Sequence, residues 1–497
     1  MSTPMINGPS TPQTFDFQRL QKIVSLVDSS PFMSVDTVNL GATPQTAADG
    51  ARDVIIMRPS DGLFMSAEQA TAQVAAGVAE QGVKVDDTLE SVHGVTAHVG
   101  ASEAATLQKA GYQVFDNSLR SMMPVFPSQC YTASAKKSKS FVSSAKTMPV
   151  VDPVALTHSD AVQRQGATGK GQVVAVIDSG FDHPDTPLVA WKDFVDSSSK
   201  PIDPVGHGTH VAGDILQIAP DAQIVGVRVM NEKGQGRPSD IIKGIQWAVQ
   251  NKEKYNISVI NMSLGGEPVG VPSSENPLDK AVRDAIKKGI TVVSAAGNSG
   301  PGEHTIGSPA DEPLGIAVGA GLDRRTVSDF SSRGPTDDNL EKPDVMAPGE
   351  YINSWAVPGS QMDKMAGTLQ KIRDMSDDQL VRLLKAKPDL ANQLGLPSDI
   401  LDMSPEDRQK ALNDALPPIY KPDATHVAAP GTSFASPITA GVVADLKSAD
   451  PSLTPQKVKD VLTSTADPMG SQYSRNDQGS GFVNAEKALQ AVKADQA

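Results

Sequence analysis

GQVVAVID, residues 171–178, is a nearly continuous apolar run that ends in an aspartate. Four more short apolar runs follow along the chain: AQIVGVRVM (222–230), SVINMSL (258–264), GITVVSAAG (289–297) and GIAVGA (315–320). Between them, DIIKGIQWAVQNKEK (240–254) and NPLDKAVRDAIKKG (276–289) repeat their apolar residues with a helical period. Strands of this kind that alternate with helices indicate a parallel sheet covered on both faces. The sequence therefore predicts a large α/β domain.

Polar side chains stand near the ends of these apolar runs. Asp178 closes the first run, and Asn298 comes directly after the fourth. Open α/β sheets place their functional groups at the carboxyl ends of strands, where both residues are expected. His207 stands in GHGTHVAG (206–213), where glycines flank an expected transition from loop to helix. Taken singly, Asp178 and Asn298 could also be ordinary strand-end residues.

Ser433 stands in GTSFASP (431–437), and Pro437 suits the first turn of a helix. The serine is then expected near the positive end of the helix dipole, a suitable place for a nucleophile. Alone, the stretch is explained more simply by a serine that caps the helix. Acyl transfer needs a hydroxyl nucleophile, an imidazole base, a carboxylate and oxyanion donors, so the combination of residues decides for catalysis.

A metal site is the other chemistry that the histidines could support. His207 and His210 form an H-x-x-H pair, but no glutamate or third ligand stands at the spacing of known zinc motifs. Asp182, His183 and Asp185 also resemble ligands, although solvated polar groups of a loop explain them more simply. We therefore predict no metal at these residues and expect His210 to pack beside His207.

Five motifs resemble, in the same order, the signatures of subtilisin-like serine proteases (peptidase S8): VVAVIDSG (173–180), GHGTHVAG (206–213), NMSLGG (261–266), AAGNSG (295–300) and GTSFASP (431–437). The resemblance covers about residues 150–358 and 425–495, and the chain order Asp, His, Ser is also that of subtilisin. It implies a three-layer α/β sandwich with a mostly parallel sheet and the activity of a serine endopeptidase. The implied orienting carboxylate, general base, nucleophile and oxyanion donor are Asp178, His207, Ser433 and Asn298, respectively.

The same resemblance implies where a peptide or protein substrate binds. It implies that Ser263, Leu264 and Gly265 form the edge that pairs with the substrate in β fashion. It also implies a pocket for the substrate residue before the cut, with Ala295 and Gly297 in one wall and Gly307 at the floor. Small residues leave that pocket open for a sizeable apolar or aromatic side chain. KGQGRPS (233–239) resembles the loop on the other side of the cleft, where Arg237 either favours acidic substrate neighbours or faces solvent.

The N-terminal third of the chain has a different organisation. Residues 1–50 are rich in Ser, Thr, Pro and Gln and are expected to be a weakly ordered leader, except that FDFQRLQKIVSLV (15–27) could form a helix. Residues 51–124 follow the order β-α-β-β-α-β of a small ferredoxin-like domain. In organisation this domain resembles the family's propeptide, which chaperones folding and then acts as an intramolecular inhibitor.

Residues 125–150 have the composition of a linker. If the domain before them is a propeptide, the chain is a zymogen, and self-cleavage is expected between Pro124 and Met148.

Residues 359–424 interrupt the alternation of strands and helices. Three amphipathic segments follow one another there without a strand: QMDKMAGTLQKIRDM (361–375), SDDQLVRLLKA (376–386) and SPEDRQKALNDAL (404–416). We predict a helical insertion that divides the catalytic domain into residues 151–358 and 425–497. The insertion leaves the sheet just before the helix of Ser433, so it could cap the cleft or dock a protein partner.

Composition excludes several other classes of protein. The 497 residues suffice for two or three domains, and the net charge of 44 − 58 = −14 argues against a nucleic-acid surface. A single cysteine, Cys130, permits no internal disulfide. No stretch resembles a Sec-type signal or a membrane span, so a cytoplasmic location, or secretion by a leaderless route, is expected.

Departures from the family pattern lead to two further expectations. After GHGTHVAG the chain runs through DILQIAPDAQIVGVRV (214–229), which leaves no room for the family's calcium-holding loop. The usual tight calcium site is therefore expected to be absent, and no cofactor is needed for catalysis. Two alternatives to a general protease stay open, namely a catalytically silent binding protein of the same fold and a dedicated processing protease for one partner.

Overall fold

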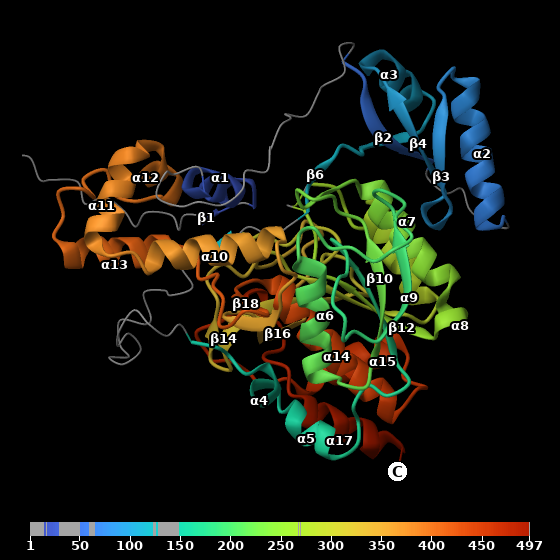
Figure 1. Ribbon diagram of the computed structural model, residues 1–497. Coiled ribbons are helices and arrows are strands. Elements are labelled where there is room, and N and C mark those ends of the chain that lie inside the picture. The colour runs from blue at the N-terminus through green and yellow to red at the C-terminus, as the bar shows by residue number, and fades with distance from the viewer. Residues whose placement is uncertain are drawn as a thin grey trace, which may run out of the picture.

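The computed structural model describes residues 14–15, 17–28, 50–58, 65–122, 126–127, 149–266, 268 and 270–496. Figure 1 shows a large α/β body, a small α+β domain formed by β2 to β5 with α2 and α3, and a group of helices, α10 to α13. Within the described residues, no helix is long and apolar enough to cross a membrane.

An eight-stranded sheet forms the centre of the large body. Its strand order is β15-β14-β13-β12-β8-β10-β9, and β16 also pairs with β14. All neighbours are parallel except β14 and β15. The strands are β8 (Val173–Asp178), β9 (Leu188–Asp193), β10 (Gln223–Arg228), β12 (Ile257–Met262), β13 (Thr291–Ala295), β14 (Ile316–Asp323), β15 (Thr326–Val327) and β16 (Val345–Pro348). The prediction of an α/β fold with a mostly parallel sheet is confirmed.

Helices cover this sheet and set the positions of the site. On one side α6 (His207–Ile218) packs against α14 (Thr432–Ala449), and on the other α7 (Pro238–Gln250) packs against α9 (Pro277–Lys287), as Figure 1 shows. Every residue of β8 is buried, which explains its continuous apolar sequence. The remaining helices of the body are α4 (Pro153–Thr157), α5 (Ser159–Arg164), α8 (Lys252–Tyr255), α15 (Pro455–Thr465), α16 (Arg475–Gln478) and α17 (Ala485–Gln496).

The small domain has its own sheet and core. Its antiparallel strands lie in the order β3-β4-β2-β5, and its elements follow the chain as β-α-β-β-α-β. They are β2 (Arg52–Met57), α2 (Ala67–Glu80), β3 (Val85–Leu89), a 3₁₀ turn (Glu90–Val92), β4 (Gly94–Val99), α3 (Ala101–Lys109) and β5 (Gln113–Asp116). One face buries Val54 and Ile56 beneath α2 and α3, whereas Ile55 and Met57 on the other face join the core of the large body.

A helical group interrupts two paired strands of the large body. β17 (Ile352–Trp355) and β18 (His426–Ala429) are antiparallel partners. Between them lie α10 (Gln361–Arg373), α11 (Asp377–Ala386), α12 (Pro388–Leu394) and α13 (Pro405–Ala415). The sequence predicts three helical segments here, and the structure adds the short α12. We call residues 359–424 the insertion.

Short paired segments connect the N-terminal part of the chain to itself and to the large body. The helix expected in the leader occurs as α1 (Phe17–Asp28) and lies against the insertion (Figure 1). β1 (Thr14–Phe15) pairs with β7 (Phe126–Pro127), and β6 (Arg120–Ser121) pairs with β11 (Gln235–Gly236). Residues 29–49 of the expected leader and residues 128–148 of the expected linker (125–150) lie outside the described residues.

The contact between α6 and α14 depends on a glycine. A Cβ on Gly441 of α14 would lie 2.6 Å from Ile218 Cβ and 3.0 Å from the carbonyl oxygen of Ile215, both in α6. Neither atom is the end of a flexible side chain, so the two helices would have to separate.

We expect Gly441→Ala to lower the free energy of unfolding by about 1–3 kcal/mol because it overpacks this contact. Gly367→Ala is the matched control, since a Cβ on this glycine of α10 would meet only Lys421 Cδ at 4.0 Å. Alanine is the better helix former by about 1 kcal/mol, so the control should be neutral or stabilising. The measurement is the midpoint of urea unfolding for each variant, with Ser433→Ala added to both to prevent digestion. Equal changes in the midpoint for Gly441→Ala and Gly367→Ala would contradict this account.

Candidate active site

The four residues proposed for catalysis come together at one edge of the large sheet. Asp178 ends β8, His207 begins α6, Asn298 follows β13, and Ser433 is the second residue of α14. Their side chains come from the carboxyl ends of two strands and the amino ends of two helices. All four residues are buried, with exposed fractions of 0 to 4%.

Asp178 holds the imidazole of His207. The ring Nδ1 lies 2.8 Å from Asp178 Oδ1, and the same oxygen accepts a hydrogen bond from the backbone N–H of Ser179 at 2.7 Å. Burial acts to lower the pKa of His207, but the carboxylate of Asp178, assisted by Asp203 and Asp214, outweighs it and raises the pKa. A carboxylate in this position keeps the proton on Nδ1 and leaves Nε2 to act as the base.

Ser433 is held at the start of its helix by a neighbouring strand end. Its Oγ donates to the carbonyl oxygen of Ser263 at 3.1 Å, and Ser263 Oγ donates to the carbonyl oxygen of Ser433 at 2.6 Å. Pro437 has no N–H to bond that carbonyl, so Ser263 supplies the donor that the helix lacks. Within the described part of the chain, His207 Nε2 has no hydrogen-bond partner, so Ser433 Oγ does not bond His207 in this structure.

One expectation for this helix is wrong. Pro437 does not open α14 but lies inside it, because the helix begins at Thr432. The simpler alternative for Ser433, that it caps the helix, does not hold: Gly431 occupies that position, and no side chain makes a cap hydrogen bond. The helix starts earlier than expected because Asn298 anchors its first N–H group from the neighbouring strand end.

Asn298 has a defined orientation. Its Oδ1 accepts hydrogen bonds from the backbone N–H and the Oγ1 of Thr432, both at 2.9 Å. Thr432 Oγ1 in turn accepts from the N–H of Gly297 at 3.1 Å. Because the oxygen end of the amide is engaged with Thr432, the NH₂ end is its donor. This is the group that an oxyanion donor requires.

Asp203 is a supporting residue that the sequence analysis did not single out. Its carboxylate accepts four hydrogen bonds, at 2.7 to 2.9 Å, from Ser179 Oγ, the N–H of Gly206, and the N–H and Oγ1 of Thr209. It therefore ties the loop after Asp178 to the helix of His207. An aspartate three residues before a glycine at a helix start is the only signal in the sequence, and it is typical of many loops.

His210 lies beside the site, as expected. Its ring centroid is 4.3 Å from that of Phe434, and the Phe434 ring is in turn 5.5 Å from that of His207. Its Nδ1 contacts Asp214 at 3.1 Å, and its Nε2 contacts the carbonyl oxygen of Val427 at 2.9 Å. Both ring nitrogens are used, so His210 is not available as a metal ligand.

The residues proposed for substrate binding lie around these four. Ser263, Leu264 and Gly265 follow β12, Ala295 ends β13 with Gly297 two residues later, and Gly307 precedes a loop that returns to the same edge. The carbonyl oxygen of Ser308 in that loop accepts from the N–H of Gly266 at 3.1 Å. A backbone hydrogen bond therefore joins the residues that directly follow the proposed edge and the proposed pocket floor.

The loop expected to form the other side of the cleft is paired with another segment of the chain. β11, in the predicted KGQGRPS loop, pairs with β6, and the N–H of Met122 donates to the carbonyl oxygen of Gly234 at 3.1 Å. Met122 is buried, with 3% of its surface exposed. A segment from the N-terminal third thus adds an antiparallel strand to this loop, in the way that an extended peptide adds to an exposed strand edge.

The small domain reaches the same side of the body through polar contacts. Arg237 pairs with Asp53 and also donates to the carbonyl oxygen of Asn117 at 3.3 Å. Asn117 Oδ1 accepts from the N–H of Ser239 at 2.9 Å and so satisfies the first turn of α7. In this structure Arg237 therefore pairs with an acidic group of the chain itself, and its preference among substrates stays a prediction.

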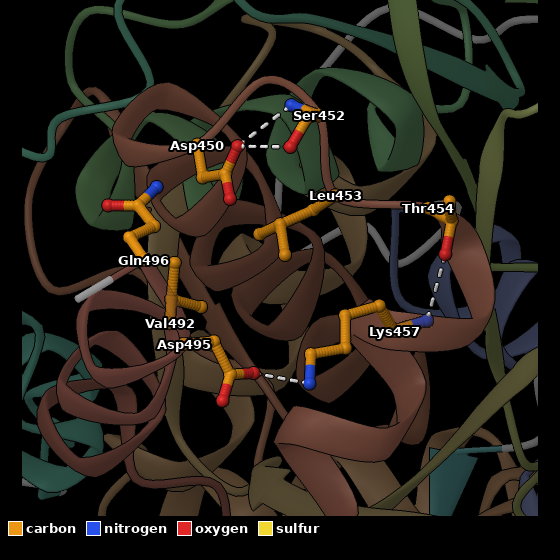
Figure 2. A pocket seen from close by; sticks show the side chains of 8 residues that line it. All are labelled: Asp450, Ser452, Leu453, Thr454, Lys457, Val492, Asp495 and Gln496. Carbon is orange, nitrogen blue, oxygen red and sulfur yellow. Dashed lines mark hydrogen bonds and ion pairs between the residues drawn. The ribbon is translucent and has the colours of Figure 1, made fainter.

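A cavity of about 230 Å³ lies elsewhere, between the ends of α14, α15 and α17 (Figure 2). Its polar side chains bond one another: Lys457 pairs with Asp495, Asp450 accepts from Ser452, and Thr454 caps α15. Because α14 is 18 residues long, this cavity lies about 25 Å from Ser433. It is therefore separate from the catalytic residues.

Comparison with known proteins identifies the family. The sequence profile of the Subtilase family matches residues 169–372 and 421–481. The chain belongs to the subtilase family. Serine protease AprX of Bacillus subtilis (strain 168) is 36% identical over 67% of this chain and 70% of its own length. Subtilisin DY of Bacillus licheniformis is 33% identical over 70% of this chain and 100% of its own.

Among solved structures, a cold adapted subtilisin-like serine proteinase aligns with 64% of this chain and 90% of its own, with 28% identity and a TM-score of 0.44. By the family match and the two relatives, this subtilase is a subtilisin-like serine endopeptidase, so protein substrates follow. The family match omits residues 373–420, which lie in the insertion, and residues 1–168.

Replacing Asn298 tests its proposed role in this subtilase. If its amide donates to the developing oxyanion, Asn298→Ala should lower kcat by about 10²–10³ with little change in KM, as loss of the corresponding donor does in subtilisin. Asn298→Asp keeps an acceptor for Thr432 but replaces the NH₂ donor by a charged carboxylate oxygen, so its kcat should fall at least as far. Steady-state kinetics in which either variant kept its full kcat would contradict the role.

The raised pKa of His207 predicts the acid limb of activity. The imidazole must be neutral to accept the proton of Ser433, so kcat/KM should fall as the pH drops through a value above 6.5. Asp178→Asn removes the carboxylate but not the burial, so the limb should move to lower pH while kcat falls about 10⁴-fold. A pH profile of the active enzyme whose acid limb did not move in Asp178→Asn would show that this carboxylate does not set the pKa.

Proposed function

We propose that this subtilase hydrolyses peptide bonds through Ser433, His207 and Asp178 and that it is made as a self-processing zymogen. The observation that carries the proposal is the buried hydrogen bond between His207 Nδ1 and Asp178, with Ser433 at the start of the adjacent helix. Each group that acyl transfer requires is present at this one edge of the sheet. The complete set counts against a catalytically silent binding protein.

In the proposed reaction, Ser433 Oγ leaves the carbonyl of Ser263 by rotating about its side-chain bond and bonds His207 Nε2. The imidazole accepts the hydroxyl proton as Oγ attacks the substrate carbonyl. The imidazolium that forms is stabilised by Asp178. Oxyanion charge is stabilised by the amide of Asn298 and the backbone N–H of Ser433 at the amino end of α14. His207 then returns the proton to the leaving amine, and water repeats the sequence on the acyl-enzyme.

Two observations support the zymogen. The segment Arg120–Met122 lies along the cleft strand β11, and the catalytic side chains are fully covered. The small domain contacts α7 through a second set of groups: Asp87 pairs with Lys243 at 2.5 Å, and the N–H of Ser91 donates to Gln246 at 3.3 Å. A domain so placed would hold its own chain in the cleft as an inhibitor until it leaves. The bond to be cut is still expected between Pro124 and Met148.

The proposed chemistry needs no cofactor, because side chains and backbone groups handle each proton and charge. The predicted absence of the family's tight calcium site is supported by the short connection after α6. That helix ends at Ile218 and β10 begins at Gln223. The intervening residues, 219–222, leave no length for a calcium-holding loop.

A more restricted enzyme, dedicated to one partner, is favoured by one observation. The start of the insertion bonds the loop that precedes His207: the N–H of Gln361 donates to Pro204 O at 3.0 Å, and that of Met362 to Val205 O at 2.9 Å. A helical group fixed there would narrow the entrance for substrates. Activity on a panel of unrelated unfolded proteins separates the two enzymes, since a dedicated protease would cut few of them.

Intact mass followed over time tests the zymogen most simply. Purified wild type should split between residues 124 and 148, whereas Ser433→Ala should stay whole. This result would support the nucleophile, the inhibitor domain and the linker together. If both chains stayed whole, self-processing would be refuted, and if both split, a contaminating protease rather than Ser433 would be responsible.

A further inference from the structure

Helix α1 is bound to the insertion by a continuous apolar face. Leu20, Ile23 and Val27 follow helical spacing and are each at most 1% exposed, and the helix lies against α10 and α12 (Figure 1). The apolar side chains of α10 and α12 that share their buried cluster include Met365, Leu369, Leu390 and Leu394. The contact is therefore a small hydrophobic core between two distant parts of the sequence.

A charged group completes this contact. Arg19 Nε donates to the carbonyl oxygen of Gln393 at 2.7 Å, and Arg19 Nη2 to that of Asn392 at 3.1 Å. Both carbonyls lie in the last turn of α12, where helices lack internal donors and attract cations. The apolar face thus supplies most of the buried surface of the contact, and the hydrogen bonds of Arg19 fix the position of α1 along α12.

Helix α1 and the small domain belong to the same part of the chain, N-terminal to the expected cleavage region. Both α1 and α12 lie outside the residues that match the family. The N-terminal segment therefore contacts the catalytic part at two separate places. The small domain and β6 hold α7 and the cleft, and α1 holds the insertion.

We propose that α1 is a second anchor of the inhibitor segment and that the insertion is its receptor. Resting on the proposed self-processing, this means that the segment stays bound at both sites after the linker is cut and keeps the enzyme latent. Residues 29–51 join the two anchors covalently, so release of one leaves the other at a high effective concentration. Two linked contacts of this kind bind about 10²–10⁴-fold more tightly than one alone.

The test uses the full chain with Ser433→Ala, so that it does not depend on self-processing. A recognition sequence for a site-specific protease is placed within residues 130–145, the linker is cut, and the catalytic part is immobilised. Release of the N-terminal fragment is then followed by intact mass. If wild type never processes itself, the proposed function fails but this measurement still decides about the anchor.

The decisive variant is Ile23→Glu, which places a carboxylate in the buried face of α1. Its fragment should dissociate at least about 100-fold faster than the unsubstituted fragment. Ser25→Glu, on the exposed face of the same helix, adds the same charge and should leave the rate unchanged. Deletion of residues 1–28 should match Ile23→Glu, which excludes an effect of misfolding in the variant helix. Fragments that dissociate at one common rate would overturn the proposal.

Discussion

The contact between α6 and α14 is the constraint on which the site depends. His207 begins one helix and Ser433 is the second residue of the other, so the spacing of the helices sets the spacing of the proposed base and nucleophile. Gly441 lets them approach to a distance that even a methyl group would prevent. Asp178 and Asn298 then complete the arrangement from strand ends of the same sheet. The catalytic geometry is thus a property of the core rather than of mobile loops.

The N-terminal part of the chain contacts the large body through β11 and α7. The family match contains all four candidate catalytic residues, whereas the small domain, β6, α1 and residues 373–420 of the insertion lie outside it. Ser433 bonds Ser263 instead of His207, and the catalytic side chains are buried. These features belong together if the structure is that of a latent precursor. Access to Ser433 is then controlled by departure of the N-terminal segment.

Much of this could be predicted from sequence because the signals are local. Continuous apolar runs predicted β8, β10, β12, β13 and β14, since strands buried on both faces need apolar residues at every position. Each of the four candidate catalytic residues stands in a short motif of six to eight residues, and such a motif can be recognised without knowledge of the rest of the chain.

What could not be predicted depends on contacts between distant residues. Pro437 was placed too early because the first turn of α14 is anchored by Asn298, 134 residues away. Asp203 gives no signal of its own, since its donors come from two separate loops and a helix. The seven residues of α12 contain too few apolar positions to show a period. An amphipathic pattern indicated α1, but only the structure identifies the insertion as the surface it covers.

The most direct test of a latent serine endopeptidase is the rate at which a fluorophosphonate probe labels Ser433. The probe reacts only with an activated serine that it can reach. The account predicts slow labelling of the intact chain and fast labelling, at Ser433 alone, once the linker has been cut and residues 1–127 have been removed. Equal labelling before and after removal would contradict the latency, and no labelling in either form would contradict Ser433 as the nucleophile.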